Sequence, residues 1–108
     1  MNRRIAVACA AIIMLSATSG RVIADDAGSA YKQSMEKMNA DMQKGMDPDA
    51  TKAWARMMIA HHQGAIDMSR IVLRETRDPT IRRMAEKSTE EQQTEIKQLQ
   101  EWLSKHDK

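Results

Sequence analysis

Sulfur and imidazole groups dominate the chemistry that this sequence could perform. The chain contains ten methionines and three histidines, but one cysteine, Cys9, and no phenylalanine. Beyond residue 24 there are eight methionines against three leucines, although leucine is ordinarily among the commonest residues. Thioether and neutral imidazole suit a soft ion such as Cu(I) or Ag(I), whereas Mg²⁺ or Ca²⁺ would require oxygen ligands. The composition therefore indicates a soft-metal site.

A first group of methionines recurs at helical spacing. Its members are separated by three, four and four residues, which places them within an arc of about 80° on one side of a helix. They are Met35, Met38, Met42 and Met46. One interpretation is an adaptable apolar stripe that packs on a neighbouring helix. The other interpretation is a thioether array that binds metal, which is favoured because the segment lacks Leu, Ile and Val. The four methionines span about 16 Å, which is too long for one ion, so more than one binding position is expected.

A second group surrounds two adjacent histidines. Met57 precedes His61 by four residues, Met58 precedes His62 by four, and Met68 follows His61 by seven, so we expect thioethers and imidazoles on one side of a helix. The alternative is that His62 lies on the helix surface and His61 is a hydrogen-bonded core group. The candidate metal ligands of both groups are Met35, Met38, Met42, Met57, Met58, His61, His62 and Met68.

Two Asp-Pro pairs divide the chain into helices. Asp47-Pro48 and Asp78-Pro79 each combine a capping acid with a proline that suits the first turn of a helix. Together with hydrophobic periodicity, they predict helices over residues 29–44, 48–77 and 79–105. Aromatic residues make up only 3%, which disfavours strands. We therefore predict an all-α, antiparallel up-down-up bundle with the second helix in the middle.

Antiparallel pairing predicts which residues lie at the same level. A turn centred near residues 46 and 47 places Met35 level with Met58. The second turn places His61 level with Glu95, and Glu95 or Gln92 could then hold the imidazole in one tautomer.

The first 24 residues are typical of a secretory signal. Arg3 and Arg4 precede an apolar run, and Ala24 provides a small residue at the cleavage site. About a dozen apolar residues are too few to cross about 30 Å of hydrocarbon. We predict a signal peptide over residues 1–24, a single domain over residues 25–108, a periplasmic or secreted location, and no membrane attachment after cleavage.

Removal of the signal changes the charge balance. Without Arg3, Arg4 and Arg21, the 17 basic residues fall to 14 against 15 acidic ones, so the net charge is −1. This balance gives no reason to propose a nucleic-acid partner.

Motifs typical of enzymes are also missing from the sequence: there is no Glu-x-x-His pair, no activated nucleophile and no phosphate-binding glycine loop. Asp67 could serve as a base, but it is expected beside Arg70 on a solvated face. We predict a protein without enzymatic activity.

Three segments carry a family resemblance. The segments MMIAHHQGAIDM, QQTEIKQLQEWL and YKQSMEKMNADM resemble the family called domain of unknown function 305, which includes CopM-like periplasmic copper-binding proteins. The resemblance implies a ferritin-like helical bundle that binds Cu(I) or Ag(I) through the eight candidate ligands, for copper sequestration, transfer or tolerance. Asn39 departs from the family pattern because relatives often carry histidine there.

The resemblance leaves the partners open. A chain this short leaves room for a second copy to complete a four-helix arrangement, and copper transfer would need a donor or acceptor protein. The rival hypothesis is a metal-independent interaction module whose methionines form an adaptable groove for a partner protein.

Overall fold

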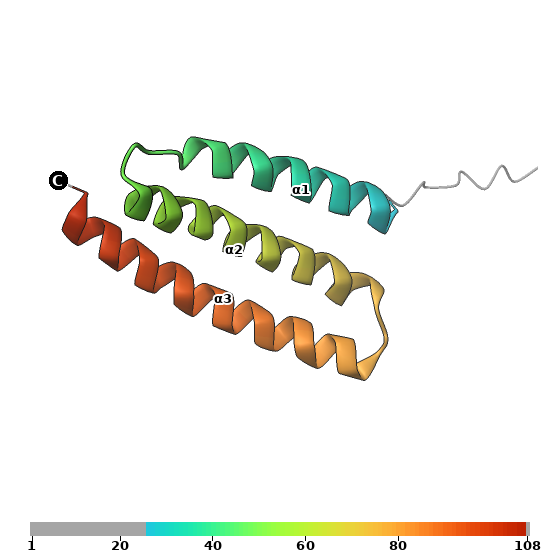
Figure 1. The fold of residues 1–108 in the computed structure, drawn as a ribbon. Helices are drawn as coiled ribbons and strands as arrows, with labels where there is room; N and C mark the ends of the chain where they lie inside the picture. Colours follow the sequence, from blue (N-terminus) through green and yellow to red (C-terminus); the bar gives the residue numbers. More distant parts are fainter. Residues whose placement is uncertain (1–25, 108) are drawn as a thin grey trace, which may run out of the picture.

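The computed structural model describes residues 26–107, which form three helices (Figure 1). They are α1 (Ala27–Lys44), α2 (Ala50–Glu75) and α3 (Pro79–His106). Within this range there is no strand, so the predicted all-α class is confirmed. The helices run antiparallel in chain order with α2 in the middle, which confirms the predicted up-down-up arrangement. None of the three has an apolar stretch that could span a bilayer. The predicted signal peptide lies outside the described residues.

Each helix begins after an aspartate that caps it. The carboxylates of Asp26, Asp49 and Asp78 accept hydrogen bonds from backbone N–H groups of the following turn, at 2.7 to 3.0 Å. Such caps satisfy donors that have no partner inside the helix. Pro79 follows Asp78 in the first turn of α3, so the Asp78-Pro79 pair starts a helix as predicted.

The Asp47-Pro48 pair does not start a helix, and that prediction was wrong. Asp49 caps α2 instead, while Asp47 accepts the N–H of Asp49 at 2.8 Å and an Arg56 N–H at 2.6 Å. Because Arg56 engages the Asp47 carboxylate, the capping role falls to the next acid in the chain. Residues 45–49 therefore form a loop instead of a tight turn.

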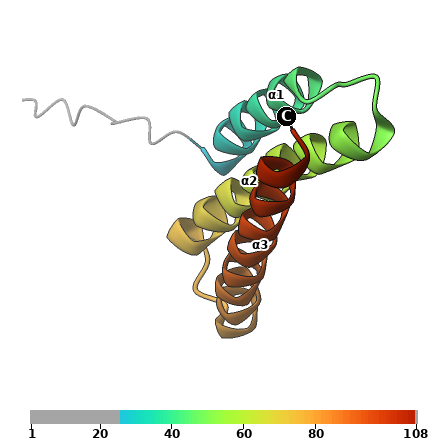
Figure 2. The same cartoon turned by 90° about the vertical axis from the view of Figure 1, so that its left-hand side faces the viewer.

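The three helices form a single layer. Both α1 and α3 pack against α2, and within residues 26–107 they do not pack against each other (Figures 1 and 2). The buried residues lie mainly on α2, with one on α3 and none on α1. Ile66 is the single large side chain that is fully buried in the described part. The core is therefore thin, as expected for a helix covered on two opposite sides only.

Arg56 joins three separate parts of the chain at one end of the layer. Its guanidinium donates to Asp47 in the loop and to both carboxylate oxygens of Asp107, at 2.6 and 2.7 Å, just beyond α3. The hydrogen bonds from Arg56 Nη2 to both carboxylate oxygens hold the pKa of Asp107 below its usual value. This pair connects residues that are 51 positions apart.

The Arg56–Asp107 pair predicts a pH-dependent stability. Because folding lowers the pKa of Asp107, the pair stabilises the fold above about pH 4, the ordinary aspartate value, and this contribution is lost as the pH falls through the lowered pKa. We expect Arg56→Gln to lower the melting temperature at pH 6 and to have a smaller effect near pH 3. Circular dichroism melts of both proteins measure this. An equal difference at both pH values would mean that Arg56 stabilises by packing alone.

Candidate metal centre

The interface between α1 and α2 joins the two methionine groups at two glycines. The Met38 side chain lies directly on Gly64, where an added Cβ would stand 2.7 Å from Met38 Cγ, 3.0 Å from its Cβ and closest to its sulfur. About two turns along α1, an added Cβ on Gly45 would stand 3.0 Å from the backbone nitrogen of Met57. The helices therefore approach more closely than side chains at these two positions would allow.

These contacts set a register that differs from the predicted one. Since Met38 lies level with Gly64, Met35 three residues earlier lies level with Asp67, not with Met58. The error is about two and a half turns, roughly 13 Å. The error arises because the chain continues beyond the end of α1 through the 45–49 loop before it turns back. The first turns of α2 therefore extend beyond that end. In the observed register, Met38 and Met42 lie on either side of the level of His61.

Helical geometry separates the candidate ligands of α2 into two directions. Gly64 faces α1, and at about 100° per residue Met57, Met68 and His61 point within about 60° of it. Met58 points about 120° away from Gly64, and His62 about 160° away. The expectation that all these groups share one side is therefore corrected.

The ligands that share the α1–α2 interface form what we call the sulfur cluster. On α1, Met38 and Met42 are half-buried, as are Met57 and Met68 on α2, while His61 is exposed at the edge. Met35 lies beside the cluster with 47% of its surface exposed, and Met46 is 68% exposed in the loop. The sulfur cluster comprises Met38, Met42, Met57, His61 and Met68.

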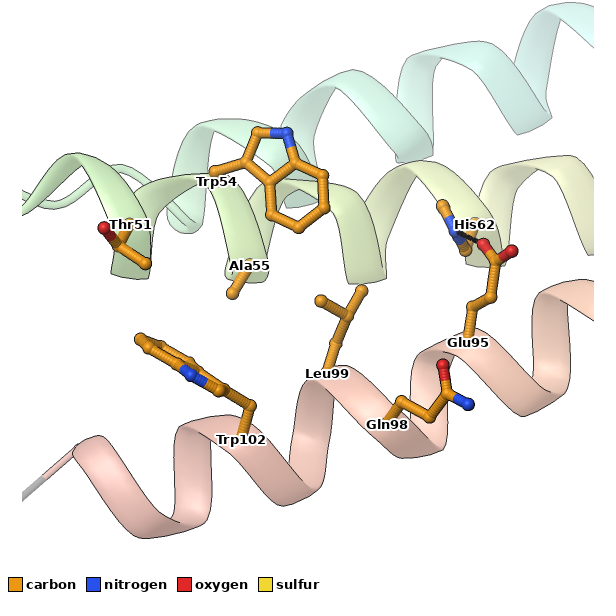
Figure 3. Close-up of a pocket in the computed structure, with 8 residues that line it drawn as sticks. All are labelled: Thr51, Trp54, Ala55, His62, Glu95, Gln98, Leu99 and Trp102. Atoms are coloured by element: carbon orange, nitrogen blue, oxygen red, sulfur yellow. Dashed lines mark hydrogen bonds and ion pairs between the residues drawn. The ribbon is translucent and has the colours of Figure 1, made fainter.

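His62 belongs to the opposite side of α2. It is only 9% exposed, and its Nε2 forms a hydrogen bond with a Glu95 carboxylate oxygen on α3 (Figure 3). Its Nδ1 is buried without a hydrogen-bond partner. The alternative that placed His61 in the core and His62 on the surface is thus reversed. Glu95 had been expected level with His61, so the α2–α3 register was correct to within one residue.

A hollow beside His62 was not anticipated from the sequence. It has a volume of about 540 Å³ and lies between α2 and α3, with Trp54 on one side and Trp102 on the other (Figure 3). Trp102 stacks on His106, with ring centroids 4.1 Å apart. The α2–α3 register, which the sequence did predict, would have been sufficient to bring Trp54, Leu99 and Trp102 together. The complete lining is Thr51, Trp54, Ala55, His62, Glu95, Gln98, Leu99 and Trp102.

Oxygen ligands are not gathered in the described part of the chain. Over residues 26–107 there is no group of three or more His, Cys, Asp or Glu side chains that could hold a metal ion. Asp67 accepts a hydrogen bond from Gln63 at 3.1 Å and lies 3.6 Å from Arg70, which agrees with its predicted place on a solvated face.

The close approach at Gly64 gives a testable prediction. Alanine is a better helix former than glycine by about 1 kcal/mol, yet its methyl group would collide with Met38. Because overpacking typically costs about 1–3 kcal/mol, we expect Gly64→Ala to leave stability unchanged or lower it by up to about 2 kcal/mol. Urea unfolding measures the change. Combining it with Met38→Ala should recover the helix-propensity gain, and stabilisation by Gly64→Ala alone would contradict the contact.

Fold and site together define a small three-helix protein with thioether and imidazole groups between its first two helices. The sequence profile of the family described as Domain of unknown function (DUF305) matches residues 14–103, and the chain belongs to this family. The predicted family membership is therefore confirmed. The matched range begins inside the segment predicted as an export signal. A comparison with curated proteins finds no match.

Proposed function

We propose that the protein is an exported, non-enzymatic copper-binding protein that holds Cu(I), or Ag(I) in its place, at more than one position along the sulfur cluster. Its role is to sequester copper or to pass it to an acceptor protein in the cell envelope. The observation that carries this proposal is the contact of the Met38 side chain with Gly64. This contact places the methionine stripe of α1 against the side of α2 that bears Met57, His61 and Met68.

The ligand types support a soft monovalent cation. Thioether sulfur is uncharged and polarisable, and together with imidazole it favours Cu(I) over hard divalent ions. The four thioethers are half-buried, while His61 is exposed at the edge, which gives the ion a route between solvent and the sulfur atoms. Because the donors come from two helices, a bound ion connects α1 to α2 and should stabilise the folded chain.

A competition titration tests the proposal. Purified protein is titrated with Cu(I) against a coloured chelator, alongside a variant with Met38→Leu, Met57→Leu and Met68→Leu. Leucine keeps a similar volume and removes the sulfur. We expect the variant to bind at least about tenfold more weakly, a change of about 1.4 kcal/mol.

Met84 provides the matched control, because it is 63% exposed on α3, away from the cluster. Met84→Leu should bind Cu(I) as the parent does. The proposal fails if the parent does not compete with the chelator, or if the folded triple variant competes equally well.

A second function is favoured by the exposed apolar side chains. Met35 and Trp54 are 47% and 59% exposed, which suits a metal-independent surface for a partner protein. This function predicts no rise in melting temperature on adding Cu(I) or Ag(I), whereas copper binding predicts a rise that depends on metal concentration.

A further inference from the structure

The three-helix layer has one strongly polar face. Two adjoining hollows on this face are lined by side chains from all three helices. Asp41 comes from α1, Gln63 and Arg70 from α2, and Gln93 and Gln100 from α3. Charged and amide side chains of all three helices therefore meet on this face, together with Ile59, Ile66 and Ile96. A separate hollow on α3 is lined by Glu90, Glu91 and Glu95.

The opposite face carries most of the exposed apolar side chains. On α2, Trp54 points about 180° away from Gln63, and on α3, Met84 points about 160° away from Gln100. Trp54 is 59% exposed and Met84 is 63% exposed. Trp54 and Trp102 line the hollow between α2 and α3 (Figure 3).

Further apolar residues extend this face to α1 and along α3. On α1, Met35 points about 120° away from Asp41 and is 47% exposed. Ile81, near the start of α3, is 42% exposed. We call this the apolar face; it comprises Met35, Trp54, Met58, Ile81, Met84, Leu99 and Trp102.

The thin core makes the apolar face significant. Only four apolar residues are buried in the described part, and three of them are small or lie near a helix end: Ala55, Ile71 and Ala85. Helices in stable domains usually bury one side in a layer packed on another layer. In the single layer of this chain, no second layer covers the apolar face, which is exposed to solvent.

We propose that the apolar face is the contact surface between two copies of this chain, which stack into a two-layer, six-helix dimer. The size of the face supports this occupant. Helices about 27 to 42 Å long, at a spacing of 8–10 Å, give a face on the order of 900 Å². Each partner in a standard stable complex contributes about 800 Å², whereas a single docked helix would cover about a third of this face.

The chemistry of the face also suits an identical partner. A two-fold dimer brings the same patch of both copies together, so a highly charged patch would repel itself. Here the members of the apolar face carry no charge, and Glu95 beside them is paired with His62. Glu90 and Glu91 line an adjoining hollow. The hollow beside Trp54 offers space for side chains that protrude from the partner copy.

Dimerisation goes beyond the proposed function and does not require metal. Met35 and Met58 belong to the apolar face and are not members of the sulfur cluster. Failure of copper binding would leave the dimer intact, because the test is made on metal-free protein.

The oligomeric state tests this surface. Sedimentation equilibrium of metal-free protein is compared for the parent, for Trp54→Glu with Met84→Glu, and for Gln93→Glu with Gln100→Glu as a control on the polar face. We expect a dimer for the parent and the control at about 10 μM, and dimerisation at least about a hundredfold weaker for the apolar-face variant. Circular dichroism verifies the helix content of all three.

A monomeric parent, or a control variant that dissociates while the apolar-face variant does not, would overturn the proposal. If the apolar-face variant fails to fold, Trp102→Phe protein provides the second measurement. Its remaining indole, Trp54, should show fluorescence that shifts to shorter wavelength as concentration rises through the dimer transition. Emission that is independent of concentration in a dimeric protein would place the contact elsewhere.

Discussion

Ile66→Ala is expected to lower the free energy of unfolding by about 2–5 kcal/mol, the loss typical of a buried isoleucine truncated to alanine. Ile66 is 2% exposed and is the one large side chain fully buried in residues 26–107. Truncation removes the apolar contacts of this buried side chain and leaves a cavity. A domain of this size has a total stability of only about 4–12 kcal/mol, so this loss is a large fraction of the total.

Urea unfolding followed by circular dichroism measures this loss, with Ile81→Ala as the matched control. Ile81 is 42% exposed, so the same truncation there should cost less than about 1 kcal/mol at a concentration where the protein is monomeric. Equal losses at the two positions would show that Ile66 is not the centre of the core.

His61→Asn and His62→Asn are expected to have opposite effects on metal binding and stability. His61 is exposed in the sulfur cluster, so its replacement should weaken Cu(I) binding about tenfold or more and change stability little. His62 is buried and bonded to Glu95, so its replacement should cost about 1–3 kcal/mol of stability. Cu(I) affinity of folded His62→Asn protein should match that of the parent.

The two histidine variants control for each other, since they make the same chemical change at adjacent positions. Chelator competition and urea unfolding on both proteins provide the comparison. A loss of Cu(I) affinity in His62→Asn with none in His61→Asn would contradict the division of the two imidazoles between opposite sides of α2.

The accuracy of the predicted registers depended on how each connection is built. Only three residues separate α2 from α3, and Asp78 caps directly before Pro79, so the level of Glu95 could be predicted to within one residue. The first connection contains two competing acids, Asp47 and Asp49. Which of them caps α2 depends on Arg56, whose other partner lies at the far end of the chain. Local sequence patterns carry no information about that distant pair.

The candidate ligands show a similar division. Packing of the α1 methionines against α2 was one of two interpretations, and it holds for part of the stripe: Met38 lies on Gly64 and Met42 is half-buried, whereas Met35 and Met46 are exposed. The interpretation of His61 and His62 as one group overlooked that adjacent residues on a helix diverge by about 100°. Which imidazole became buried depended on the position of Glu95 on α3, and hence on tertiary packing.

The most direct test of the sulfur cluster is methyl NMR of protein labelled with ¹³C at the methionine methyl groups and titrated with Ag(I). If the cluster binds Ag(I), the methyl signals of Met38, Met42, Met57 and Met68 each shift and saturate, while that of Met84 stays in place. Shifts confined to the exposed Met46 and Met84, or no saturable shift in the four cluster signals, would contradict soft-metal binding between α1 and α2.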